Sequence, residues 1–336
     1  HKKNNFNVAQ SLYNDVLKRD TNYLAAHNNL GILLNQMGEH QKAINCFQKA
    51  IQINPNYESA HNNLGFLFFK KEEYQKAVNC YQKATQINPN YADAYYNLGN
   101  TYKILKEFEK AVNCYQKTIQ INPNYFVAYY NLGNTFREIE DRQKAVNCYQ
   151  KAIQINPKYI DALLNLINIE AQLGRFDEAF AYLKNLKGFS CDLERAYGSV
   201  FDALEKWNKL EELSQLIKDA KKDFEIFPAS LYVYEVILQY RLGNTAEALR
   251  ISLQIETTEF TSIQASSYYE IVGKIYDKLG KFKLAFDSFD KMNAFAIKHP
   301  FYQRINTDDY LLKITNSLNE VKSTKRESTP YLRITK

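Results

Sequence analysis

The sequence predicts an all-α fold, a right-handed α-solenoid built from helix–turn–helix repeats. Three observations lead to this prediction. The segment Ala43–Tyr57 (AINCFQKAIQINPNY) returns almost unchanged after Ala77, Ala111 and Ala145, at intervals of 34 residues. A stretch with helical hydrophobic spacing precedes each copy. The 336 residues include only 11 glycines and 7 prolines, which are few for an all-β chain with many turns.

Each repeat is predicted to contain two helices. The four regular units are Leu24–Tyr57, Glu58–Tyr91, Ala92–Tyr125 and Phe126–Tyr159. In the third unit, the first helix buries the stripe Tyr95, Leu98, Gly99 and Tyr102, and the second buries Phe108, Ala111, Val112, Tyr115 and Ile119. Asn122-Pro123 ends the second helix, because proline disfavours a helical residue before it and has no N–H to donate.

Small residues recur where the two helices of a unit must approach each other. The first helices contain Gly31, Gly65, Gly99 and Gly133, and the second helices contain Ala43, Ala77, Ala111 and Ala145. Glycine inside a helix costs about 1 kcal/mol relative to alanine, so its presence in four copies indicates close helix crossing. Aromatic residues are expected to fill the space beside these contacts, and they are Phe47, Tyr81, Tyr115 and Tyr149.

This combination of offsets resembles the tetratricopeptide repeat, a 34-residue unit with Leu-Gly, aromatic, alanine and proline positions at set intervals. The resemblance is specific because several offsets recur together in four consecutive copies. It implies that stacked units form a continuous core, with the first helices lining an inner, concave surface.

The repeat becomes less regular along the chain. Ile160–Leu186 forms a fifth unit in which Ile167 replaces the glycine, and the pattern returns from Ser266 after a divergent stretch. We therefore predict a regular array over residues 1–187, divergent helical hairpins over 188–298, and a helix with a polar tail over 299–336. The first repeat is expected to be incomplete, because Phe6, Ala9 and Tyr13 already match the middle of a unit.

Composition and motifs argue against several classes of function. The net charge of +6 is spread along the chain, whereas nucleic-acid binders show a dense basic stripe. No apolar run reaches the roughly 18 residues of a spanning helix, so no membrane insertion is expected. No phosphate-binding loop, nucleophile elbow or zinc motif is present, so we predict no catalytic residues, cofactor or metal. The protein is expected not to be an enzyme.

Four cysteines share one repeat position and are too far apart for disulfides. They are Cys46, Cys80, Cys114 and Cys148. Their interpretation as buried or half-buried thiols predicts a reducing, cytoplasmic location. An N-terminal targeting signal stays open, because the chain is expected to begin inside a repeat.

The most informative feature is a row of asparagines on the first helices, which we call the asparagine ladder: Asn29, Asn63, Asn97, Asn131 and Asn165. A second row, one turn further along the helices, contains Asn100 and Asn134, followed by Asn168. An asparagine amide both donates and accepts hydrogen bonds, so it can pair with an extended peptide backbone of any sequence. The alternative is a structural role, because asparagine is common at this position of the family, where it would support helix packing.

Other side chains are expected to reach the same inner surface. They are the aromatic residues Tyr96, Tyr130, Phe66 and Phe69 and the basic residues Lys70, Lys103 and Arg137. Aromatic rings could take apolar side chains, and the bases could take carboxylates or a peptide C-terminus. The alternative for the bases is an ordinary solvated surface.

The leading hypothesis is a non-catalytic scaffold that holds an extended peptide or a partner protein in the concave groove. A rival hypothesis is the substrate-recognition arm of a larger transferase. The repeats resemble those of protein O-GlcNAc transferases, and the later part resembles bacterial chains that join such repeats to a sulfotransferase. A third hypothesis is self-assembly into a homo-oligomer, because solenoids with very similar copies can stack end to end.

Overall fold

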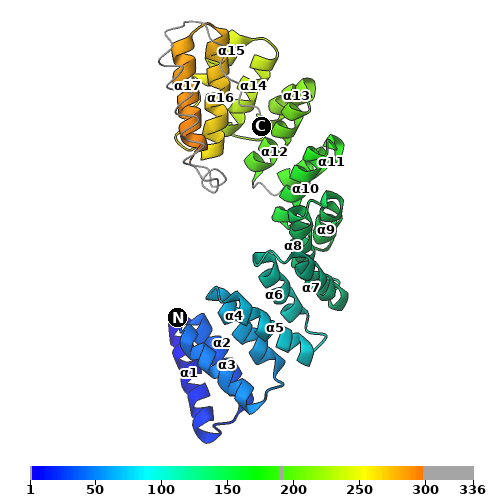
Figure 1. Cartoon of the computed structure of the whole chain (residues 1–336), viewed down its shortest axis with the longest axis vertical. Helices are drawn as coiled ribbons and strands as arrows, with labels where there is room; N and C mark the ends of the chain where they lie inside the picture. The colour runs from blue at the N-terminus through cyan, green and yellow to red at the C-terminus, as the bar shows by residue number, and fades with distance from the viewer. Residues whose placement is uncertain (1, 189–191, 298–336) are drawn as a thin grey trace. The chain divides into compact units, whose positions relative to one another are not determined.

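The computed structural model describes residues 2–188 and 192–297, which contain 17 α-helices and no strand (Figure 1). The predicted all-α solenoid of helical repeats is confirmed. Contacts between residues divide the chain into two compact units, His1–Leu193 and Glu194–Lys336. The domain boundaries given above stay a prediction, and the helix expected within residues 299–336 lies outside the described residues.

The first unit consists of one helix followed by five helix pairs. Its helices are α1 (Lys2–Arg19), α2 (Leu24–Gln36), α3 (His40–Ile53), α4 (Glu58–Lys70), α5 (Tyr74–Ile87), α6 (Ala92–Ile104), α7 (Phe108–Ile121), α8 (Phe126–Glu138), α9 (Arg142–Ile155), α10 (Ile160–Gln172) and α11 (Phe176–Lys187). Each pair from α2/α3 to α10/α11 corresponds to one predicted repeat. Their apolar stripes merge, and one buried cluster runs from Ala77 in α5 to Ile169 in α10.

The second unit contains six helices. They are α12 (Leu193–Lys206), α13 (Leu210–Ala220), α14 (Ala229–Arg241), α15 (Thr245–Ser252), α16 (Ser262–Lys278) and α17 (Phe282–Ala296). Helix α16 begins four residues before the recognisable repeat pattern because Thr261 and Gln264 form a capping box that starts it earlier.

Glycines of the first helices lie against aromatic rings of the second helices. A Cβ atom at Gly99 would lie 2.8 Å from Cε1 of Tyr115, and one at Gly133 would lie 2.7 Å from Cε1 of Tyr149. Both distances are shorter than van der Waals contact, so only glycine fits without movement. The close approach expected between glycine and alanine is therefore made by glycine and the ring itself, while alanines such as Ala111 are fully buried.

Asparagine–proline pairs end the second helices as expected. Asn122 is the C-cap residue of α7 and has extended backbone angles. Its Oδ1 accepts a hydrogen bond from the backbone N–H of Asn124 at 3.1 Å, and Asn88 pairs with Asn90 in the same way at 3.0 Å. These short-range bonds turn the chain toward the next first helix.

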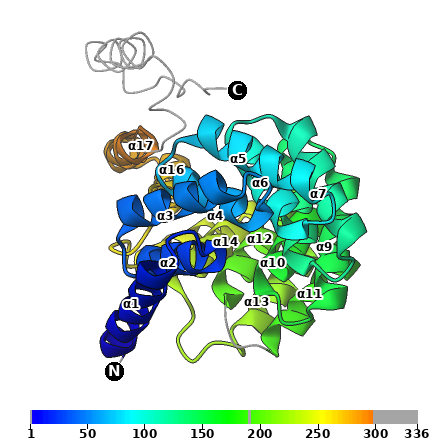
Figure 2. The ribbon, with the colours of Figure 1, turned by 90° about the horizontal axis from the view of Figure 1, so that it is seen from below.

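The first helices lie on the inner side of the first unit. Successive first helices contact one another directly, in the pairs α2/α4, α4/α6 and α6/α8, whereas successive second helices make no contact of that extent among the described residues. Figure 2 shows α4, α6 and α10 toward the inside of this unit and α5, α7, α9 and α11 toward its outside. We call the surface formed by α2, α4, α6, α8 and α10 the first-helix face.

No helix within residues 2–188 and 192–297 is long and apolar enough to cross a membrane.

Candidate functional site

The asparagine ladder follows the first-helix face, and its amides link successive repeats. Asn63 Nδ2 donates to Asn28 Oδ1 at 3.1 Å, and Asn97 Nδ2 donates to Asn62 Oδ1 at 3.1 Å. In the later repeats Asn131 Nδ2 donates to the hydroxyl oxygen of Tyr96 at 2.8 Å. The ladder therefore has the structural role that the sequence left open as an alternative, because every ladder amide after Asn29 ties its first helix to the one before it.

The second row of asparagines holds the buried tyrosines in place. Asn100 Oδ1 accepts from the Tyr115 hydroxyl at 2.7 Å, and Asn134 Oδ1 accepts from the Tyr149 hydroxyl at 2.8 Å. Both tyrosines are fully buried, so their hydroxyls need a partner inside the protein. The accepting oxygens of this row are thus already in use.

The ladder keeps hydrogen-bonding capacity toward solvent. The Oδ1 atoms of Asn63, Asn97 and Asn131 accept no hydrogen bond from the described residues, and these three side chains are half-buried. At the two ends of the row the oxygens are occupied. Asn165 Oδ1 accepts from Arg137 at 3.2 Å, and Asn29 Oδ1 accepts from Asn28 at 3.5 Å. Three amide oxygens at repeat spacing, in the middle of the row, therefore have no donor among the described residues.

The predicted aromatic residues divide into two groups. Tyr96 lies 5.1 Å from Tyr125 between ring centroids, and Tyr130 lies 5.0 Å from Tyr159, so each forms an aromatic pair at the edge of the ladder. Phe66 instead is 38% exposed, so part of its side chain is accessible to a ligand.

Phe69 packs within its own hairpin. Its ring meets Tyr74 edge to face, with centroids 5.7 Å apart. It lies half-buried against the core of the first unit and has less surface to offer than Phe66.

The three predicted basic residues make no ion pair among the described residues. Lys70 Nζ lies 5.0 Å from the centroid of the Phe66 ring. Lys103 is half-buried, and this burial lowers the pKa of its ammonium group, while Glu138 nearby opposes the shift. A desolvated ammonium without a partner gains more from a carboxylate than an exposed one does.

Two sets of contacting residues were not predicted from the sequence. Asn28 and Asn62 are buried and serve as acceptors for the ladder. Tyr125 and Tyr159 supply the rings that pair with Tyr96 and Tyr130. The sequence shows both positions recurring every 34 residues. Every position of the repeat recurs in this way, whichever face it lies on, so the recurrence alone does not single these residues out.

Family models match the repeats that build this site. Models described as tetratricopeptide repeat match residues 25–57, 92–125 and 126–159, and another matches residues 46–79. A TPR repeat model matches residues 67–106. Together the matched stretches cover residues 25–159, from α2 to α9. The chain is a tetratricopeptide repeat protein.

Solved structures similar to this tetratricopeptide repeat protein include MamA, which is 32% identical in sequence. The match covers 48% of this chain and 94% of the MamA chain, with a TM-score of 0.44. YrrB, described as a TPR protein with an unusual peptide-binding site, is 20% identical over 55% of this chain and 95% of its own, with a TM-score of 0.48. PilF of Pseudomonas aeruginosa is 18% identical over 74% of this chain and 96% of the PilF chain, with a TM-score of 0.49. No curated protein matches the chain.

Tetratricopeptide repeats are protein-interaction modules and typically non-catalytic, so this protein is a protein-binding scaffold.

The histidines and cysteines of this tetratricopeptide repeat protein that lie outside the ladder have structural roles. His27 and His61 each hydrogen-bond through Nε2 to a backbone carbonyl six residues earlier, at 2.8 and 2.9 Å. Burial raises the pKa of the Cys80 thiol to about 11 and of the Cys114 thiol to about 12, which makes both poor nucleophiles. Within the described residues, no group of three His, Cys, Asp or Glu side chains could hold a metal ion.

Proposed function

We propose that the first-helix face binds an extended peptide segment of a partner protein, without catalysis. The observation that carries this proposal is the row of amide oxygens on the half-buried side chains of Asn63, Asn97 and Asn131, which accept no hydrogen bond from the described residues. An extended peptide carries backbone N–H donors along its whole length, and these donors do not depend on its sequence.

The ladder amides are held in place before any ligand binds. In Asn97 the Nδ2 atom is anchored on Asn62 of the preceding repeat, so the oxygen has a defined direction. Ordering a polar side chain on binding costs about 0.5–1.5 kcal/mol. A ladder that is fixed by inter-repeat hydrogen bonds avoids much of this cost, so its structural role supports binding instead of competing with it.

Aromatic residues supply contacts for apolar side chains of the peptide. Tyr96 and Tyr130 stand one residue before the ladder positions Asn97 and Asn131, and Phe66 lies three residues after Asn63. All three side chains keep exposed surface, so a peptide bound at the amide oxygens could also place apolar side chains on these rings.

Basic residues favour peptides that carry carboxylates. Lys103 and Arg137 occupy the same position in neighbouring repeats, and Lys70 lies in the repeat before them. None of the three is neutralised by an ion pair in the described part of the chain, so an acidic side chain or a peptide C-terminus would find an unpaired cation.

The experiment uses an array of random 12-residue peptides to select unrelated ligands, followed by fluorescence polarisation on the full chain. The double variant Asn97→Ala/Asn131→Ala should weaken binding of all selected peptides alike. Loss of two hydrogen bonds worth about 0.5–1.5 kcal/mol each corresponds to roughly 5- to 150-fold.

A matched control is Asn79→Ala/Asn113→Ala, which removes two exposed asparagines at equivalent positions of the second helices α5 and α7. This control should leave affinity unchanged. Selected peptides that bind the ladder variant as tightly as the unaltered chain would refute the proposal, provided circular dichroism shows that the variant is folded.

The cytoplasmic location, the homo-oligomer and the transferase recognition arm stay predictions from the sequence.

A further inference from the structure

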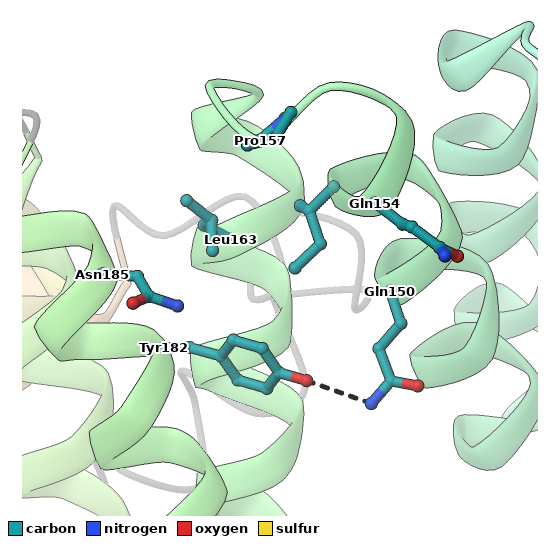
Figure 3. Close-up of a pocket in the computed structure, with 7 residues that line it drawn as sticks. Gln150, Gln154, Pro157, Leu163, Tyr182 and Asn185 are labelled. Carbon is teal, nitrogen blue, oxygen red and sulfur yellow. Dashed lines mark hydrogen bonds between the residues drawn. The ribbon is translucent and has the colours of Figure 1, made fainter.

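A hollow lies on the first unit between α9, α10 and α11, apart from the asparagine ladder (Figure 3). Its volume is about 650 Å³, within the range of small-molecule and side-chain binding pockets. It is lined by Gln150, Ile153, Gln154, Pro157, Leu163, Tyr182 and Asn185. Its walls combine apolar side chains with side-chain amides.

Leu163 occupies a repeat position that holds a ring in the four preceding repeats. The equivalent residues are His27, His61, Tyr95 and Tyr129. In the two histidine repeats the ring reaches the backbone carbonyl six residues earlier, from His27 to Thr21 and from His61 to Pro55. The residue six positions before Leu163 is Pro157, which lines the hollow. A leucine cannot donate a hydrogen bond, and the Pro157 carbonyl accepts none from the described residues.

A second replacement forms the wall of the hollow. Tyr182 stands where the preceding repeats have Cys46, Cys80, Cys114 and Cys148. Its hydroxyl oxygen accepts a hydrogen bond from Gln150 Nε2 at 3.0 Å, which fixes the ring across the gap between α9 and α11. In Figure 3, Asn185 from α11 and Gln150 from α9 stand on opposite sides of Leu163. The hollow therefore has an apolar floor, an aromatic wall and a polar rim.

We propose that this hollow binds an aromatic side chain with a polar ring hydrogen, tyrosine or histidine, presented by a partner polypeptide. The chain itself shows which chemistry fits, because its own rings occupy the equivalent place in four other repeats. The bound ring packs on Ile153 and Tyr182, which are half-buried, and directs its O–H or N–H to the Pro157 carbonyl, as His61 does to Pro55. Asn185 Nδ2 and Gln154 Nε2 remain for the partner's backbone, while Gln154 Oε1 accepts from Lys151 Nζ at 2.8 Å.

The test uses p-cresol, the side chain of tyrosine, as the probe, and follows the methyl resonances of Ile153 in the full chain by NMR. A ligand of this size should bind with a Kd on the order of 1 mM. Toluene, which lacks the hydroxyl, should bind at least several-fold more weakly, because it leaves the Pro157 carbonyl unpaired.

Two variants test the position of the ring. Leu163→Tyr restores the side chain of Tyr129, and Leu163→His restores that of His61, so each should fill the hollow and weaken p-cresol binding at least tenfold. The ladder variant Asn97→Ala/Asn131→Ala is the control and should bind p-cresol like the unaltered chain. Absence of any shift at Ile153, or full binding to a folded Leu163→His protein, would overturn the proposal.

Discussion

The two units build helix pairs with the same contact between a glycine and an aromatic ring, but among the described residues the asparagine ladder belongs to the first unit. In the first unit a glycine lies under an aromatic ring in four consecutive repeats, as with Gly99 and Tyr115. In the second unit Gly273 lies under Phe289, where an added Cβ would be 2.7 Å from the ring. The helix crossing is thus preserved where the rest of the repeat has diverged.

The ladder position shows the difference between the units. Asn97 stands two residues before Gly99, and the residue two positions before Gly273 is Ile271, which is buried. A helix pair can therefore pack through the glycine contact with an apolar residue at the ladder position. The ladder in the first unit is therefore not required by the packing of a single hairpin, and its amides instead link one hairpin to the next, as Asn97 does to Asn62.

Links across neighbouring hairpins also differ in chemistry. In the first unit the links made by Asn63 and Asn97 join neutral amides, as in Asn97 and Asn62. In the second unit they join charges, with Arg241 Nη1 3.3 Å from Glu205 and Lys221 Nζ 2.7 Å from Glu235. Neutral links repeat without like-charge repulsion along a row, whereas ion pairs need a specific partner at each step.

The substitution with the largest expected effect tests whether the two units unfold independently. Tyr115→Ala removes a fully buried ring from the first unit and should lower its free energy of unfolding by about 3–5 kcal/mol. Trp207, the single tryptophan, lies in the second unit and reports it selectively by fluorescence. The circular dichroism midpoint should fall while the Trp207 midpoint stays in place. Equal shifts of both signals would show that the units unfold together.

A smaller effect would sharpen the role of the glycines. Gly99→Ala places a methyl group against Tyr115 and should destabilise the first unit by about 1–3 kcal/mol through overpacking. Gly198 in α12 is the matched control, because the nearest atom to its added Cβ is Leu231 Cδ2 at 3.7 Å. Gly198→Ala should stabilise the second unit by up to about 1 kcal/mol. Urea denaturation measures both, and a stabilised Gly99→Ala protein would contradict the close-contact account.

The smallest effect concerns the turns inside the hairpins. Glu72 has φ of 61°, a left-handed conformation that Gly38 and Gly280 occupy at equivalent turns. Glu72→Gly should stabilise the first unit by about 0.5–1 kcal/mol, because relief of strain exceeds the entropy cost of glycine. The control Gln116→Gly, at an exposed position inside α7, should cost about 1 kcal/mol. Thermal melts that move both variants in the same direction would exclude this explanation.

Much of the candidate site could be placed on a face from the sequence, but its contacts could not. The helical offset of Asn63, Asn97 and Asn131 assigned them to the first helices. Their hydrogen-bond partners lie 35 residues earlier in the chain, so only the stacking of repeats brings them within reach. Phe69 was expected beside Phe66 on the same surface, and the approach of Tyr74 after the turn gives it an aromatic partner inside the hairpin.

The sequence by itself determined the repeat length, the helix pairs, the glycine crossings and the asparagine–proline ends, because each depends on local geometry or on a period that copies exactly from unit to unit. Only the tertiary structure decided which oxygens of the ladder stay available and where Leu163 and Tyr182 leave a hollow. Those outcomes depend on the distance between side chains of different repeats, and that distance is set by how whole helices stack.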